Sequence, residues 1–261
     1  MPYSHNAYIL QNGLISVKVE KGRIASIRDL ISRRELLAEG RTMGLSIYED
    51  YPPSYDAWET EIYSLDTEEE IRFDSARITE QGPWRAGLAL EAAFGQSRAT
   101  VTLSLDALPA TAIATEPDAR AALVISIDID WREKHRFLRL VVPTALRSEV
   151  ATYETQFGLT KRPTHRNTTW DAAKFEACGH RFVDLSESDY GCSLISESKY
   201  GYSVEGSTMR ASLLKAGTYP DAHQDEGQHA MAFAVYPHAH ALEGSDAIAY
   251  ARLFNNPIEP S

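Results

Sequence analysis

Apolar and polar residues alternate along most of the chain. Residues 14–19 and 24–28 alternate in this way on either side of a glycine-containing turn, Glu20-Lys21-Gly22-Arg23. Alternation with a period of two is typical of a half-buried β-strand, so these residues predict a β-hairpin. The same pattern predicts further strands at residues 71–78, 86–94, 99–105, 122–129, 137–142, 191–195, 208–214 and 230–236.

Helical periodicity is almost missing from the sequence. Residues 29–40 have a weak helical pattern of one or two turns, which ends at Gly40. Many short strands without helices between them predict an all-β fold, a large antiparallel β-sandwich rather than a parallel α/β sheet. We expect residues 1–261 to form this sandwich region, with a smaller β lobe at about residues 206–261.

Two long polar loops interrupt the predicted strands, at residues 49–61 and 159–174. In the first loop, two prolines precede Tyr55-Asp56-Ala57-Trp58-Glu59. Aromatic faces that stack on sugar rings, together with carboxylates that accept hydrogen bonds from hydroxyl groups, are one way to hold a carbohydrate. The alternative is a stiff loop whose Trp58 plugs one end of the sandwich, since tryptophan most often supplies buried bulk.

The second loop belongs to a strongly polar segment at residues 162–176, RPTHRNTTWDAAKFE, which carries five formal charges. The segment is too polar for a core strand and too irregular for an amphipathic helix. It presents either a catalytic centre or a loop that completes a site formed elsewhere. Arg166 is suited to clamp a ligand, because a guanidinium fork matches carboxylates and paired hydroxyl groups. Alternatively, Arg166, Asp171 and Glu176 form ion pairs that stiffen a surface loop.

The histidines and cysteines lack the spacing of metal ligands. His165 and His180 lie fifteen residues apart, without the short pairings that bring zinc ligands to one face. Cys178 and Cys192 have no CxxC neighbour, and each is expected to behave as a small buried hydrophobic residue. His238 is expected in a solvated chain end. The sequence therefore predicts no metal site in this chain.

The charge balance narrows the choice of partners. The sequence has 37 Asp and Glu residues against 26 Lys and Arg, a formal net charge of -11. This disfavours nucleic acid and anionic membranes, which both require a basic contact surface. The sequence has no run of about 18 apolar residues, so it predicts no transmembrane helix. The first ten residues, MPYSHNAYIL, lack the basic and apolar regions of a secretion signal.

Short motifs follow one another between residues 156 and 238. They are QFG at 156–158, RPTHRNTTWD at 162–171, KFEAC at 174–178, HRFVDLSE at 180–187, KYGYSVEG at 199–206, SLLK at 212–215, YPD at 219–221 and YPH at 236–238. This span resembles the C-terminal β domain of glycoside hydrolase family 38, the class II α-mannosidases, and is most similar to the cytosolic and vacuolar branch. Earlier in the chain, YDAWE at 55–59 resembles the WDAWD loop of that family, with Tyr55 for Trp and Glu59 for Asp, and DWREKH at 130–135 also fits.

The resemblance implies a galactose-mutarotase-like supersandwich that belongs to a retaining α-mannosidase, acting on terminal α-linked mannose in oligosaccharide and N-glycan catabolism. Family members carry their zinc ligands and their catalytic nucleophile in an N-terminal β/α barrel, which a helical bundle follows. None of these motifs can be matched in this sequence. The resemblance therefore implies that barrel, bundle and Zn²⁺ lie outside this chain, and that the full enzyme is a cytoplasmic or vacuolar homo-oligomer.

With this resemblance, we expect the two polar loops to face the missing barrel. They would either line its sugar pocket or seal the interface between the domains, and the sequence does not decide between these roles. A shared partner surface requires both loops at the same end of the sandwich. The candidate residues for substrate binding or for the domain interface are Asp56, Trp58, Arg166, Asn167, Trp170, Asp171, Tyr200, Tyr202 and Glu205.

Two other functions fit the sequence. A stand-alone sugar mutarotase or epimerase has a similar sandwich architecture and uses a histidine acid and a glutamate base on facing strands, for which His180 and Glu205 are the available pair. A free-standing carbohydrate-binding module needs only the aromatic and polar loops. Both alternatives place the functional chemistry within this chain, whereas the α-mannosidase hypothesis places the catalytic residues outside it.

Overall fold

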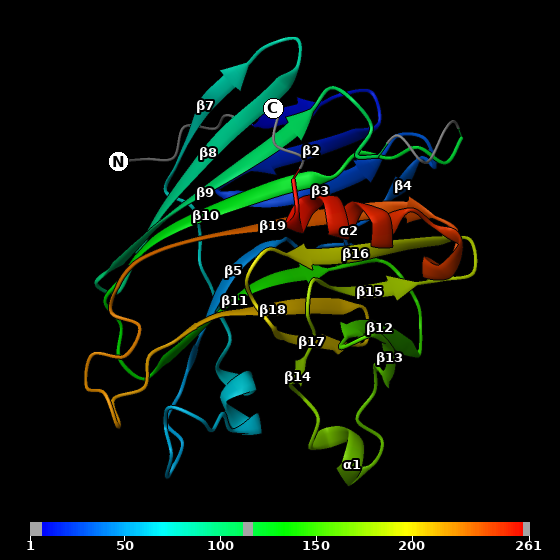
Figure 1. Cartoon of the computed structure of the whole chain (residues 1–261). Coiled ribbons are helices and arrows are strands. Elements are labelled where there is room, and N and C mark those ends of the chain that lie inside the picture. The colour runs from blue at the N-terminus through cyan, green and yellow to red at the C-terminus, as the bar shows by residue number, and fades with distance from the viewer. Residues whose placement is uncertain (1–6, 112–116, 258–261) are drawn as a thin grey trace.

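The computed structural model describes residues 7–111 and 117–257, and antiparallel β-strands make up most of it (Figure 1). The largest sheet has nine strands. Their order across the sheet is β13 (Gly158–Pro163), β12 (Val150–Thr155), β15 (Phe182–Ser186), β16 (Tyr190–Ser196), β19 (Gly227–Ala239), β10 (Leu123–Trp131), β9 (Ser97–Asp106), β8 (Arg85–Phe94) and β7 (Ser75–Gln81).

Two smaller sheets complete the sandwich. The six-stranded sheet has the order β14 (Ala177–Cys178), β17 (Gly201–Glu205), β18 (Thr208–Lys215), β11 (Arg136–Pro143), β5 (Gly44–Glu49) and β6 (Glu69–Glu70). The four-stranded sheet has the order β1 (Tyr8–Gln11), β2 (Ile15–Glu20), β3 (Arg23–Asp29) and β4 (Arg34–Glu35).

Side-chain alternation decides which face of each strand enters the core. In β2, Ile15, Val17 and Val19 are buried while the residues between them stay partly exposed. One hydrophobic cluster contains side chains of all three sheets, for example Val17, Val101 and Leu140. The two smaller sheets therefore cover one face of the nine-stranded sheet, and burial of this shared surface supplies the main stabilisation.

A helix covers part of the opposite face of the nine-stranded sheet. In Figure 1, α2 (Ala247–Asn255) lies across β16 and β19, and the short 3₁₀ helix η2 (Leu242–Gly244) precedes it. Ala247 and Tyr250 of α2 pack with Phe182 and Tyr236 in a second hydrophobic cluster. Because β16 is covered on both faces, all seven of its residues are buried.

Most predicted strands are confirmed. The predictions at 14–19, 24–28, 86–94, 99–105, 122–129, 137–142, 191–195, 208–214 and 230–236 correspond to β2, β3, β8, β9, β10, β11, β16, β18 and β19, whereas 71–78 overlaps β7 only in its second half. Alternation in the sequence does not predict β1, β5, β12, β15 or β17, and helical periodicity does not predict α2. In β5, β12 and β15, neighbouring residues on both faces are buried, so the alternation that marks a strand is lost.

Three further expectations are corrected by the fold. Residues 29–40 contain turns and β4 rather than a helix, because Leu36 and Leu37 are drawn into the core as extended chain. Residues 206–257 form no separate lobe, since β18 and β19 lie inside two different sheets. Part of the expected loop at 159–174 is the edge strand β13. Within the described residues, no helix is long and apolar enough to cross a membrane.

Candidate functional site

Both polar loops project from the same end of the molecule, the lower end in Figure 1. The chain between β5 and the 3₁₀ helix η1 (Ile62–Thr67) forms one of them, and α1 (Thr169–Ala172) with its flanks forms the other. The sequence separates the two loops by about a hundred residues, and only the sandwich brings them to one end. This end of the molecule, residues 50–67 and 162–176, is called the loop surface below.

Asp56 fastens the first loop to a distant part of the chain. Its carboxylate accepts hydrogen bonds from the Thr218 backbone N–H at 2.7 Å, the Thr218 hydroxyl at 3.0 Å and the Tyr219 backbone N–H at 3.0 Å. The Thr218 backbone hydrogen bond is the main reason why the pKa of Asp56 lies below its usual value. Three of the four acceptor positions of this carboxylate are therefore used to hold the loop in place.

The first loop exposes its aromatic rings. Trp58 is 66% exposed and meets Tyr55 edge-on, with the ring centroids 6.3 Å apart. Tyr51 stacks on His135, with centroids 4.8 Å apart. The interpretation of Trp58 as a plug for the sandwich end is wrong, because Leu, Ile and Val residues already fill the core. Large rings held outside the core on a tethered loop are available to a partner surface.

Replacing Asp56 by alanine is expected to release this loop without unfolding the sandwich, because the three hydrogen bonds it breaks are part-buried or exposed and lie outside the hydrophobic core. The backbone amides of Thr218 and Tyr219 should lose their protection against hydrogen exchange, while the amides of β10 and β19 keep theirs. Glu59→Ala, which removes an exposed carboxylate from the same loop, is the matched control. Unchanged protection at Thr218 in Asp56→Ala would contradict the tethering role.

The second loop is organised by a short helix cap. Thr168 caps α1 by accepting from the Asp171 backbone N–H at 3.1 Å, and its hydroxyl donates to the Asp171 carboxylate at 2.7 Å. This places Trp170 on the outer side of the turn, 76% exposed, and leaves Asn167 exposed. Asp171 is thus the partner of the Thr168 cap, and the Trp170 ring is accessible at the surface.

Ion pairs connect the second loop to the six-stranded sheet. Arg166 contacts Glu205 at 3.1 Å, Glu205 also lies 4.0 Å from Arg210, and Arg210 lies 3.8 Å from Glu68. This row leads from the second loop across β17 and β18 to the end of η1. The sequence predicted an ion pair for Arg166, and one is present, but the predicted partners are wrong. Arg166 pairs with Glu205 instead of Asp171 or Glu176.

Glu176 holds a buried arginine of the sheet. Its carboxylate accepts from the Arg139 guanidinium at 2.6 Å and from the Ser212 hydroxyl, and Arg139 also donates to Ser203 at 2.5 Å. The Arg139 side chain is 1% exposed. Burial lowers the pKa of Arg139, and Glu176 opposes that effect. Arg139 lies in the middle of an apolar strand, where no sequence motif marks it as a site residue.

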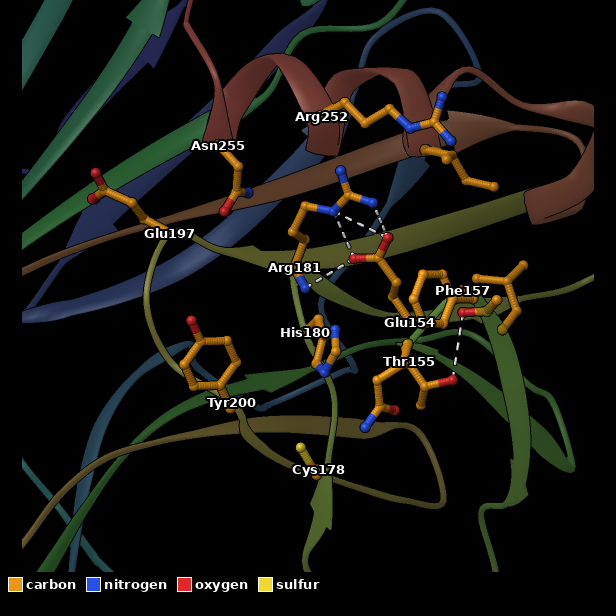
Figure 2. Close-up of a pocket in the computed structure, with 14 residues that line it drawn as sticks. Glu154, Thr155, Phe157, Cys178, His180, Arg181, Glu197, Tyr200, Arg252 and Asn255 are labelled. Carbon is orange, nitrogen blue, oxygen red and sulfur yellow. Dashed lines mark hydrogen bonds and ion pairs between the residues drawn. The ribbon is translucent and has the colours of Figure 1, made fainter.

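The three candidates on β17 and beside it have different environments. Tyr202 is fully buried, its hydroxyl donates to the His180 carbonyl at 3.2 Å, and burial raises its pKa. It is a core residue and cannot contact a ligand. Tyr200 is 59% exposed and borders a cavity together with His180 (Figure 2). Glu205 lies at the end of β17, where it pairs with Arg166 of the second loop and with Arg210.

The proposed acid and base of a mutarotase are not brought together. Cys178 pairs with Gly201 in the sheet, so His180 lies beyond the Gly201 end of β17, while Glu205 lies at its other end. Four residues along a strand span about 13 Å. The pair is therefore too far apart for acid–base catalysis on one sugar carbon, and the structure gives no support to the mutarotase alternative.

Two smaller expectations are also corrected. His238 is not in a solvated chain end, because β19 carries it into the sandwich, where it is fully buried and its Nε2 lies 2.8 Å from the Asp184 carboxylate. Cys192 is buried as expected, but Cys178 is exposed on the short edge strand β14. In the described part of the chain, no group of three or more His, Cys, Asp or Glu residues could hold a metal ion.

Two solved structures of bacterial proteins share this fold. The structure of an α-mannosidase from Enterococcus faecalis V583 aligns with a TM-score of 0.73, and the match covers 95% of this chain and 31% of the α-mannosidase chain. The structure of a glycosyl hydrolase family 38 protein from Enterococcus faecalis aligns with a TM-score of 0.75, and the match covers 95% of this chain and 32% of that protein. Both are 13% identical in sequence, so they show the fold alone. The fold of this chain is thus a β-sandwich that also occurs in these two proteins.

The sequence comparisons identify the family. The model of the C-terminal domain of glycosyl hydrolases family 38 matches residues 10–223, and the chain belongs to this family. It is 38% identical over 235 residues to an alpha-mannosidase of Saccharomyces cerevisiae and 36% identical over 231 residues to human alpha-mannosidase 2C1, matches that each cover 87% of this chain. The chain spans only about a fifth of these relatives, 22% and 21% of their lengths.

Proposed function

We propose that this chain is the C-terminal β-sandwich of an α-mannosidase that removes terminal α-linked mannose from oligosaccharides and N-glycans. The observation that carries the proposal is the family match over residues 10–223, together with relatives that are α-mannosidases. In this proposal the loop surface contacts the domains that carry catalysis. The relatives are four to five times longer than the matched region, which leaves room for those domains.

Three carboxylates in or beside the loop surface support a positioning role. A retaining glycosidase requires two carboxyl groups about 5–5.5 Å apart that are free to act as nucleophile and acid. Asp56 accepts hydrogen bonds from Thr218 and Tyr219. Glu176 forms an ion pair with Arg139, and Glu205 forms one with Arg166. These three groups are engaged in holding the loops. This supports a role of the chain as a rigid, aromatic-rich wall, with the nucleophile and the acid supplied from elsewhere in the enzyme.

Zinc does not fit the residues of the loop surface. His165 Nδ1 lies 3.8 Å from the Asp171 carboxylate, which already binds the Thr168 hydroxyl, and no third ligand type joins them within the described residues. A tetrahedral site requires three or four ligands at about 2.0–2.3 Å from one ion. We propose that the full enzyme binds its Zn²⁺ in its other domains. We also propose that the enzyme works in the cytoplasm or vacuole.

The 261-residue chain by itself is expected to show no release of aryl alcohol from an aryl α-mannoside, with or without added zinc. The same chain joined to an upstream catalytic region of a family 38 relative is expected to restore turnover, because nucleophile, acid and metal would then be present. The control is the upstream region alone, which should remain poorly active or insoluble without its β-sandwich. Zinc-dependent turnover by the isolated chain, abolished by a chelator, would contradict the proposal.

Replacing Arg166 by alanine in the assembled enzyme is expected to reduce kcat/KM by about tenfold or more, because the second loop loses the ion pair that ties it to Glu205 at the end of β17. If the loop lines the sugar pocket, KM for the mannoside should rise. If it seals the interface, the domains should separate at lower denaturant concentration with KM unchanged. Lys161→Ala, an exposed charge on β13, is the control, and equal effects of both substitutions would contradict a specific role for Arg166.

A further inference from the structure

A large cavity lies away from the loop surface, and Figure 2 shows its lining. Its volume is about 1080 Å³, just above the range of about 300–1,000 Å³ that is usual for small-molecule sites. Four separate segments form its walls: the turn between β12 and β13, the stretch between β14 and β15, the stretch between β16 and β17, and one side of α2. The family match ends at residue 223, so α2 adds a wall from outside the matched region.

The back of the cavity is a fixed pair of opposite charges. The Arg181 Nε donates to both Glu154 oxygens, at 3.0 and 2.7 Å, and the Arg181 backbone N–H donates to the same carboxylate at 3.0 Å. Burial opposes ionisation of Glu154, but hydrogen bonds from Arg181 outweigh it and lower the pKa. The pair is therefore ionised and rigid, and Figure 2 shows the outer nitrogen of the Arg181 guanidinium directed toward α2.

Aromatic rings stand on two sides of this charged pair. Tyr200 is 59% exposed and meets the His180 ring edge-on, with centroids 6.1 Å apart. Phe157 is fully exposed at the tip of the β12–β13 hairpin with φ of 60°. A bulky residue rarely adopts this left-handed conformation, and nothing in the core requires it here. Both rings thus present flat apolar surface at the opening without contributing to the fold.

The charges of the lining balance. Two guanidinium groups, Arg181 and Arg252, stand against two carboxylates, Glu154 and Glu197. A phosphorylated or carboxylated ligand would meet no net positive charge. Asn255 donates its amide hydrogens to the Ser196 and Ala251 carbonyls at 3.1 and 3.0 Å, which leaves its amide oxygen as an acceptor toward a ligand. The lining therefore suits a neutral molecule with many hydroxyl groups and an apolar ring face.

We propose that this cavity binds a neutral pyranose unit of a glycan. The apolar face of the sugar ring packs on Tyr200, and its hydroxyl groups bond to Arg181, Glu197 and Asn255. Pyranoses offer both surfaces at once, which neither an aliphatic ligand nor an anion does. The choice of mannose as the sugar to test rests on the proposed function, whereas the choice of a neutral pyranose rests on the cavity alone.

The test is a titration of the ¹⁵N-labelled chain with methyl α-mannoside, followed by amide chemical shifts. We expect saturable shifts at Cys178, His180 and Tyr200 at millimolar sugar, and binding about tenfold weaker in Tyr200→Ala, the loss of one stacking contact. Glu197→Gln should weaken binding without changing the melting temperature. Trp84→Ala removes a ring that is 73% exposed on a different hairpin and should bind as the parent does.

Three results would overturn the proposal. One is the absence of saturable shifts at the cavity with methyl α-mannoside and with other neutral methyl pyranosides. Another is equal weakening by Tyr200→Ala and Trp84→Ala, and the third is tighter binding of mannose 6-phosphate than of methyl α-mannoside. Binding by other neutral pyranosides but not by mannoside would uphold the cavity as a sugar site and change only the sugar. This titration measures binding and no turnover, so a negative result would not contradict the proposed α-mannosidase function. That function is tested separately, by the aryl α-mannoside assay of the chain joined to an upstream catalytic region.

Discussion

Replacing Asp184 by asparagine is expected to lower the free energy of unfolding by about 3–5 kcal/mol, the usual cost of leaving one member of a buried ion pair without its partner. Asp184 on β15 is 1% exposed and His238 on β19 is fully buried. The Asp184 carboxylate accepts from Ser193 at 2.7 Å, from Ser186 at 2.5 Å and from His238 Nε2 at 2.8 Å. An amide at this position offers one acceptor oxygen instead of two and carries no charge.

The measurement is urea unfolding at constant pH, with Asp189→Asn as the control. Asp189 is exposed in the turn before β16, and its backbone carbonyl accepts a hydrogen bond from the His240 N–H. The double substitution Asp184→Asn with His238→Gln should cost less than the sum of the two single substitutions, because the two side chains act as one unit. Additive costs, or a loss below about 1 kcal/mol for Asp184→Asn, would show that the pair is not coupled.

The same pair sets a pH dependence with a definite sign. Burial by itself disfavours the charged imidazole, but Asp184, the Ala239 carbonyl and the more distant Asp246 together raise the pKa of His238 above its usual value. A raised folded-state pKa stabilises the protein fully below the unfolded value of about 6.5. This contribution is lost as the pH rises through the folded pKa. Stability of the parent should thus fall with rising pH more steeply than that of His238→Gln.

Replacing Glu176 by alanine should be similarly costly, at about 3–5 kcal/mol, because it leaves the Arg139 guanidinium buried without a counter-charge. Arg139 lies over the rings of Phe137 and Tyr48, at 5.3 and 5.8 Å from their centroids, and its Nε has no hydrogen-bond partner within the described residues. Glu176 is therefore its one carboxylate contact in this part of the chain. The second loop should also become mobile, since Glu176 joins its end to β18 through Ser212.

Lys174→Ala is the control for Glu176, because Lys174 is an exposed charge two residues away in the same loop. Thermal unfolding and hydrogen exchange of residues 164–176 would report stability and loop order separately. Glu176→Gln should fall between the parent and Glu176→Ala, since an amide still accepts one hydrogen bond but supplies no charge. A melting temperature of Glu176→Ala equal to that of Lys174→Ala would disprove the structural role of the pair.

The sequence by itself determined the fold class and the family. Alternation at residues such as Ile15, Val17 and Val19 survives any tertiary arrangement, because a strand with one buried face must alternate. The ordered motifs of residues 156–238 pointed to glycoside hydrolase family 38, and the family model confirms it. The sequence also identified the polar loops, since runs such as RPTHRNTTWD are too polar for a core.

Only the tertiary structure decided what each polar residue does. Asp184 and His238 are 54 positions apart and Arg139 and Glu176 are 37 apart, so no local pattern links them. Long-range sheet pairing creates these contacts, and it also buries Tyr202 while leaving Tyr200 exposed. Helix α2 was missed for the same reason: its apolar side matches the outer face of β16 and β19, a surface that exists only after the sheet has formed.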